Sequence, residues 1–126
     1  MQRQVVTGEG LAPPIGPYSH AVRAGGFVFV SGQPGVDPAT GDVPDSFAGQ
    51  ARQAFANLAT VLRAAGSRPD LVVNTTVLVV DIADFPEMNS LFAEFFPTDP
   101  PARMTMQVPL PRGLLFSIGC TAVEAT

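Results

Sequence analysis

The stretch LVVNTTVLVVDI, residues 71–82, is the clearest strand signal in the chain. Its residues are mostly β-branched or leucine, and its two alternating sets of side chains are both largely apolar. The sets are Leu71, Val73, Thr75, Val77 and Val79 on one side, and Val72, Asn74, Thr76, Leu78, Val80 and Ile82 on the other. A strand that is apolar on both sides is typical of one whose two faces are both covered.

Two amphipathic helices are expected on either side of this strand in sequence. The first has Asp45 or Ser46 as its N-cap and extends to Ala65, with Gly66 as its C-terminal stop. The second has Asp84 as its cap and extends to Phe96. Further strands are expected at residues 3–6, 20–23, 27–31, 102–108 and 114–123, with loops at 11–18 and 32–43.

The order of these elements predicts a single α+β domain over residues 1–126, with a mixed sheet and two helices on one face. That arrangement leaves the other face of the sheet open. Because residues 71–82 are apolar on both sides, we expect the open face to be buried in a homo-oligomer.

Composition excludes several classes of function. The 126 residues carry a formal net charge of −4, and every basic residue is an arginine. Without lysine there is no protein Schiff base, and without a basic patch nucleic-acid binding is disfavoured. One cysteine and one histidine leave too few ligands for a typical metal site, so no metal is expected. No signal pattern and no long apolar run occur, which favours a cytoplasmic protein that does not bind membranes.

The segment Pro100-Pro101-Ala102-Arg103 opens the strand predicted at 102–108. Arg103 is the only basic residue between Arg68 and Arg112, and its neighbours in the strand are mostly apolar. A guanidinium cannot lose its charge in a protein, so it needs an anion or a group of carbonyl oxygens as partner. A carboxylate ligand, an Asp of a neighbouring subunit and backbone carbonyls would each satisfy it.

We expect residues 102–108 and 114–123 to form a hairpin. In that hairpin Met104 and Met106 lie under the helices with Phe116, Ile118 and Cys120. Arg103, Thr105, Ser117, Gly119 and Thr121 then share the opposite face, with Arg103 across from Gly119 and Thr105 across from Ser117. Gly119 would leave room above the sheet for a carboxylate held by Arg103.

Five other residues are candidates, and three of them, Tyr18, His20 and Asn89, have two interpretations each. Tyr18, in a loop rich in Pro and Gly, could contact a ligand or anchor the loop, and His20 could be exposed or act as an acid or base. Ser31 resembles a nucleophile only superficially, because no histidine–acid pair is near it in sequence. Asn89 is a surface residue or a ligand contact, and Cys120 is expected to be a buried, inert thiol.

Together these residues resemble the Rid family of reactive-intermediate deaminases, also called YjgF-like proteins. The resemblance covers nearly the whole chain and rests on the order and spacing of several short motifs. They are Ile15-Gly16-Pro17-Tyr18, Val30-Ser31-Gly32-Gln33, Gln50-Ala51, Asn74-Thr75-Thr76-Val77, Asn89 before Phe95-Phe96, Pro101-Ala102-Arg103 and Leu110-Pro111.

The resemblance implies a chorismate-mutase-like α+β fold and a homotrimer with clefts between subunits. It also implies hydrolysis of enamine and imine acids, such as 2-aminoacrylate, 2-iminopropanoate and 2-iminobutanoate, to 2-keto acids and ammonia, without cofactor or metal. By position, Arg103 would bind the substrate carboxylate, while Tyr18, Ser31 and Asn89 would line the cleft.

The sequence departs from the family pattern at two positions. The glutamate usual on the last strand of deaminating members aligns with Ser117, or with Gly119 if the register differs. The usual cysteine two residues after the arginine is Thr105, which keeps a backbone carbonyl that could hold water together with Ser117. We therefore expect a deaminase with an altered site; the alternative is a non-catalytic, regulatory trimer that binds a small carboxylate. Ribonuclease activity, attached to some relatives, is disfavoured by the acidic composition.

Overall fold

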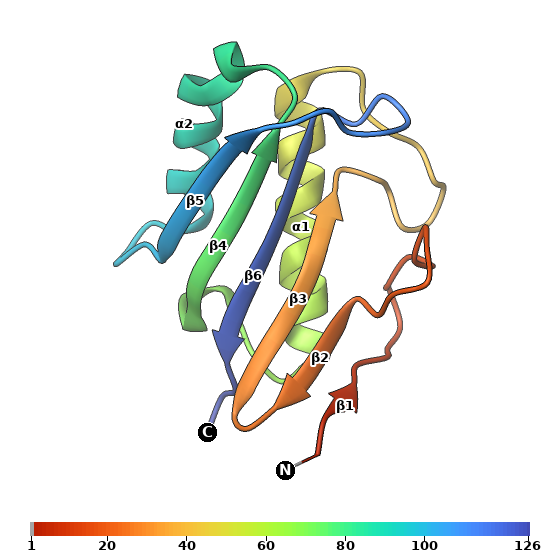
Figure 1. The fold of residues 1–126 in the computed structure, drawn as a ribbon, viewed down its shortest axis with the longest axis vertical. Helices are drawn as coiled ribbons and strands as arrows, with labels where there is room; N and C mark the ends of the chain where they lie inside the picture. The colour runs from red at the N-terminus through yellow and green to blue at the C-terminus, as the bar shows by residue number, and fades with distance from the viewer. Residues whose placement is uncertain (1) are drawn as a thin grey trace.

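The computed structural model describes residues 2–126, which form a six-stranded mixed sheet with two helices packed on one face (Figure 1). The strand order across the sheet is β1-β2-β3-β6-β4-β5. The α+β architecture predicted from the sequence is thereby confirmed. The strands are β1 (Gln4–Val5), β2 (Ala21–Ala24), β3 (Phe27–Pro34), β4 (Val72–Val79), β5 (Ala102–Gln107) and β6 (Phe116–Val123).

Helix α1 (Phe47–Ala64) begins and ends close to where the sequence predicts. The Ser46 side chain accepts a hydrogen bond from the backbone N–H of Gly49 at 3.0 Å, which caps the first turn. At the other end Gly66 adopts a φ of 78°, which a residue without Cβ reaches at little cost. The buried side of α1 packs on β3 and β6.

Helix α2 (Phe85–Phe95) connects β4 to β5, and these two strands are parallel neighbours. Strand β4 is shorter than predicted, because residues 80–82 do not continue it. The chain turns there, and the Asp81 side chain accepts from the N–H of Ala83 to cap the short 3-10 turn Ile82–Asp84. This turn leads directly into α2.

The predicted hairpin between the last two strands is wrong. β5 pairs with β4 alone, while β6 lies between β3 and β4 and is antiparallel to both. The cause is the crossover through α2, which returns the chain beside β4 in the parallel direction. The segment after β5 then crosses the end of β4 to begin β6 (Figure 1).

The predicted orientation of β5 is also wrong. Arg103 is the direct partner of Thr75, which is in turn the partner of Cys120, and partners across a sheet point to the same face. Thr75 and Cys120 are buried under the helices, so Arg103 and Thr105 point to the helix side. Met104 and Met106 point to the open side and are 60 % and 39 % exposed.

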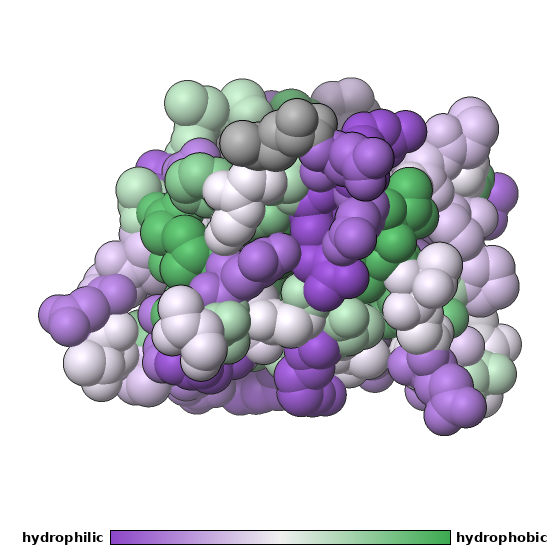
Figure 2. All heavy atoms as spheres, turned by 90° about the horizontal axis from the view of Figure 1, so that it is seen from below, coloured by the Kyte–Doolittle hydropathy of each residue, from purple (hydrophilic) through white to green (hydrophobic). Residues whose placement is uncertain are grey.

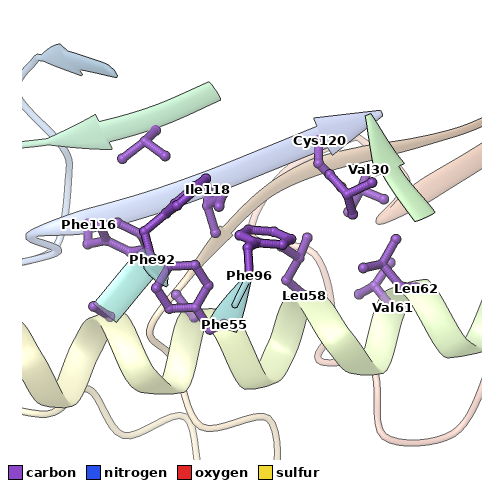
Figure 3. Packing of buried hydrophobic residues seen from close by; sticks show 14 of the residues in the cluster. Val30, Phe55, Leu58, Val61, Leu62, Phe92, Phe96, Phe116, Ile118 and Cys120 are labelled. Carbon is purple, nitrogen blue, oxygen red and sulfur yellow. The ribbon is translucent and has the colours of Figure 1, made fainter. Parts of the chain in front are cut away.

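The orientation of β6, by contrast, is as predicted, with Phe116, Ile118 and Ala122 fully buried. The core between sheet and helices is rich in phenylalanine. Figure 3 shows Phe92 of α2 and Phe96, the residue directly after α2, near Phe55 of α1, with Phe116 and Ile118 of β6 above them. The rings of Phe55 and Phe116 have centroids 5.5 Å apart.

The face of the sheet away from the helices is uncovered in a single chain. Apolar side chains on it remain exposed, among them Phe27 (44 %) and Phe29 (48 %) of β3. By contrast, the end of the molecule where both termini lie carries hydrophilic side chains between smaller apolar patches (Figure 2). Within residues 2–126, no helix is long and apolar enough to cross a bilayer.

Candidate functional site

Arg103 lies on the edge strand β5, with its guanidinium against one side of helix α2. Its central guanidinium carbon is 4.8 Å from the ring centroid of Phe92 and 5.6 Å from that of Phe85. Its Nη1 atom lies 3.8 Å from the sulfur of Met88. Aromatic faces attract a cation and fix the plane of the guanidinium without using its strongest hydrogen-bonding capacity.

The guanidinium therefore keeps its donors for another group. Among residues 2–126, no carboxylate pairs with Arg103, since the ion pairs are Arg52–Glu94 and Arg68–Asp70. Within the described residues 2–126, the guanidinium of Arg103 has one hydrogen-bond acceptor, the sulfur of Met88, which is a weak one. The backbone-carbonyl alternative for Arg103 is thus not realised among residues 2–126. A bidentate carboxylate fits the vacant donors, and such charge-assisted bonds contribute about 1.5–3 kcal/mol each.

Two more candidate residues belong to this side of the sheet. Thr105 shares the face of Arg103, and its hydroxyl oxygen is buried without a hydrogen-bond partner among residues 2–126. Asn89 is exposed on α2, four residues after Phe85 and three before Phe92, so it shares their side of the helix. Arg103, Thr105 and Asn89 thus form one group, which we call the arginine half-site.

Three of the remaining candidates lie on the open face: Ser31 of β3, and Ser117 and Gly119 of β6. There a hollow of about 420 Å³ is lined by side chains that are neutral among the described residues. The lining residues are Ser19, Val22, Phe29, Val30, Ser31, Asn74, Thr76, Gly119, Cys120 and Thr121. Ser117 lies two residues before Gly119 on β6 and shares its face of the sheet. Tyr18 directly precedes Ser19 of the hollow in the chain, and its side chain lines a separate cavity under the loop of residues 11–19. We call Tyr18, Ser31, Ser117 and Gly119 the serine half-site.

The backbones of β3 and β6 approach closely at this half-site. A Cβ atom on Gly119 would lie 3.1 Å from the backbone oxygen of Val30, and one on Gly32 would lie 2.8 Å from the Ser117 hydroxyl. The register between the two strands shifts here, between Val30 and Gln33. Gly119 thus serves close strand packing as well as leaving space, and Ser117 is only 9 % exposed.

Ser31 is not arranged as a nucleophile. Its hydroxyl donates to the backbone oxygen of Ser19 at 2.6 Å. Both ring nitrogens of His20 are engaged elsewhere, with the Ala12 oxygen and with the Gln33 side-chain amide. Within residues 2–126, His20 is therefore not directed at the Ser31 hydroxyl.

In one chain the two half-sites do not meet. β5 is separated from β6 by β4 and from β3 by two strands, which is about 10 to 14 Å at the usual strand spacing. Arg103 and Thr105 also point to the helix side, whereas Ser117 and Gly119 point to the open side. The predicted grouping of Arg103 with Ser117 and Gly119 on one face is wrong for the single chain.

Comparison with known proteins identifies the family. A family model described as Endoribonuclease L-PSP matches residues 9–124. The 2-iminobutanoate/2-iminopropanoate deaminase of Mus musculus is 40 % identical over 124 residues, which cover 97 % of this chain and 92 % of the mouse protein. The crystal structure of RidA from the Antarctic bacterium Psychrobacter sp. superposes with a TM-score of 0.92 at 34 % identity, covering 95 % of this chain and 98 % of the other. The chain belongs to the Rid family.

A further relative extends the range of organisms. A RutC family protein of Pyrococcus horikoshii is 39 % identical over 124 residues, covering 97 % of this Rid chain and 98 % of its own length. The matches span both half-sites of the Rid chain, from Tyr18 to Gly119. The resemblance inferred from the short motifs is therefore confirmed at the level of the family.

Sequence reasoning missed two supports of this Rid site. Phe85 and Phe92 hold Arg103, but a helical stripe of aromatic residues indicates only a core. Gln33, part of a motif in the sequence, is 3 % exposed and bonds His20. Its position at the end of an apolar strand indicated that its amide needs buried hydrogen-bond partners.

Cys120 is buried as expected, and burial raises the pKa of its thiol to about 12.

Proposed function

We propose that this Rid protein hydrolyses small 2-imino acids, and the enamines that tautomerise to them, to 2-keto acids and ammonia. The observation that carries the proposal is the vacant guanidinium of Arg103, held by two phenylalanine rings at the edge of the sheet. The relatives named as 2-iminobutanoate/2-iminopropanoate deaminases support the same reaction.

The proposed site lies between subunits of a homotrimer. Since the two half-sites are separated in one chain, a complete site requires the arginine half-site of one subunit and the serine half-site of the next. Arg103 would bind the substrate carboxylate, with Asn89 at the rim. Tyr18, Ser31, Ser117 and Gly119 would come from the neighbouring subunit.

The reaction needs water but no redox partner. Water adds to the C2 carbon of the imine, a proton passes to nitrogen, and the C–N bond breaks to leave a keto group and ammonia. Arg103 neutralises the carboxylate next to the reacting carbon, and positioning of water can supply much of the remaining rate. The Thr105 backbone oxygen of one subunit and the Ser117 hydroxyl of the next would hold this water.

Pyruvate release from 2-aminoacrylate generated in the assay tests the proposal. Arg103→Ala should lower kcat/KM by roughly 10- to 100-fold, the equivalent of one lost charge-assisted contact. Arg63→Ala is the matched control, because Arg63 is exposed in the last turn of α1, away from both half-sites. Wild-type protein that gives no acceleration over buffer, with this substrate and with larger imino acids, would refute the proposal.

A second candidate function is non-catalytic binding of a small carboxylate. It is favoured by the neutral lining of the hollow, where none of the described residues can accept a proton at neutral pH. This function predicts that a keto acid such as pyruvate raises the melting temperature through Arg103, without turnover of any imine. The same Arg103→Ala variant should abolish that stabilisation.

A further inference from the structure

His20 joins two parts of the chain: the loop of residues 11–19 and strand β3. Its Nε2 atom is hydrogen-bonded to the backbone oxygen of Ala12 in the loop. Its Nδ1 atom lies 3.1 Å from the side-chain nitrogen of Gln33 in β3. The imidazole therefore bridges the loop to the sheet.

These two partners select one form of the imidazole. A backbone oxygen can only accept, so Nε2 carries the proton and donates to Ala12. Nδ1 then accepts from the Gln33 amide, whose nitrogen also donates to the backbone oxygen of Ser31 at 3.1 Å. Turning the amide over would place two oxygens against each other at Ser31. The Ala12 and Gln33 contacts together fit the tautomer of His20 that carries its proton on Nε2.

The β3 end of this bridge is firmly held. Gln33 is 3 % exposed, and the Ser31 backbone N–H donates to the His20 oxygen at 2.9 Å. The Ser31 hydroxyl donates to the Ser19 oxygen. Hydrogen bonds from Ser31 thus hold the backbone of residues 19 and 20, and with it the start of the His20 side chain.

The loop end has few other attachments. A cavity of about 40 Å³ lies under the loop, between Leu11 and Ile15 on one side and Val36 and Val61 on the other. Among the described residues that line it, none is charged. Because the loop is incompletely packed there, the hydrogen bonds through His20 carry a larger part of its attachment. The edge of the Tyr18 ring meets His20 at a centroid distance of 6.3 Å.

We infer that His20 is a positioning residue, which fixes Tyr18 at the serine half-site by tying the loop of residues 11–19 to β3. Only the expected effect of His20 on KM in the imine assay rests on the proposed function. The attachment itself is a property of the folded chain and can be measured without substrate.

The composition provides two clean probes. His20 is the only histidine and Tyr18 the only tyrosine, and the sequence contains no tryptophan. Imidazole NMR signals therefore report on His20 alone, and tyrosine emission reports on the loop alone. We would compare wild type, His20→Leu, and His20→Gln, whose amide can place an N–H near the position of Nε2.

Ser67→Ala is the matched control for a lost buried hydrogen bond. Ser67 is 7 % exposed, and its hydroxyl donates to the Val123 oxygen at 2.7 Å, away from the loop. We expect nitrogen chemical shifts of the Nε2–H tautomer in wild type. Acrylamide quenching of Tyr18 should rise about twofold in His20→Leu, since the side chain is 40 % exposed in the held loop. His20→Gln should restore protection, and Ser67→Ala should match wild type.

An Nδ1–H tautomer, or equal quenching in His20→Leu and wild type, would overturn the inference. In the imine assay, His20→Leu should raise KM with kcat nearly unchanged, and His20→Gln should rescue KM. A wild-type KM in His20→Leu would show that the loop position does not matter to the site. If wild type shows no turnover, the proposed function fails, while the quenching and NMR results still decide the positioning role.

Discussion

Under the proposed function, Arg103 would bind the substrate carboxylate, since residues 2–126 surround it with aromatic rings and pair it with no acid. The rings of Phe85 and Phe92 and the sulfur of Met88 surround the guanidinium. They restrict its rotamers while leaving most of its N–H groups without strong acceptors among residues 2–126. An arginine preorganised in this way loses little conformational entropy on binding, which favours affinity for a small anion. A lysine at the same position could not reproduce the planar stacking.

Ser117 is the position where an added carboxylate should have the largest effect. Its hydroxyl can orient water but cannot accept a proton at neutral pH, so general-base assistance of roughly 10²–10⁴-fold is missing. We expect Ser117→Glu to raise kcat on 2-aminoacrylate, even if only part of that factor is recovered. Ser117→Gln, with the same length and no basic group, is the control. Equal kcat values for the two variants would show that a base at residue 117 does not limit the reaction.

At the scale of elements, the sequence predicted what its local patterns determine. Helix α1 is confirmed with its Ser46 cap, and β4 is confirmed over most of the predicted stretch. The face of β5 was mispredicted because Met104 and Met106 look like core residues. Alternation shows that two faces differ, but it cannot tell a core face from an apolar face left open in the single chain. The pairing of β5 depended on a crossover, which local patterns do not encode.

Two buried rings, Phe92 in α2 and Phe96 directly after it, allow the support of Arg103 to be separated from core packing. Phe92 and Phe96 are each 5 % exposed and both contact Phe55, but only Phe92 faces Arg103. Phe92→Leu and Phe96→Leu should each lower the free energy of unfolding by about 1 kcal/mol. Only Phe92→Leu should also weaken binding of pyruvate in calorimetric titration, by up to tenfold, because it removes a cation–π contact. Similar weakening in both variants would assign the effect to general loosening of α2.

Strand β6 carries a thiol that should be inert while the protein is folded. Burial raises the pKa of Cys120 to about 12, from an ordinary value of 9.0. At pH 8 we expect alkylation in the native state to be roughly a thousandfold slower than in denaturant. The unfolded thiol ionises first as the pH rises, so unfolding becomes more favourable above pH 9, and Cys120→Ala should reduce that loss of stability. Rapid native alkylation, measured by mass spectrometry, would contradict this burial.

At the scale of the whole molecule, the proposed homotrimer would explain both the open face and the divided site. A sheet face with exposed Phe27, Phe29, Met104 and Met106 loses apolar contact with water when copies associate. The same association can bring the β5 edge of one copy to the β3–β6 surface of another. In a closed ring every copy has one neighbour on each side, so each arginine half-site meets the serine half-site of the next copy and none is left unpaired.

Mixed trimers test whether the two half-sites come from different subunits. Arg103→Ala damages one half and Tyr18→Ala the other, so a homotrimer of either variant should have only damaged sites. In a ring of mixed composition, one junction joins an intact Arg103 to an intact Tyr18. Random assembly from equal amounts then restores about a quarter of the wild-type sites. Co-expression with two affinity tags isolates the mixed trimers, and their kcat per site should exceed that of both parents. If both residues served the same site from one chain, the mixed trimers would show only the average of the two parental activities.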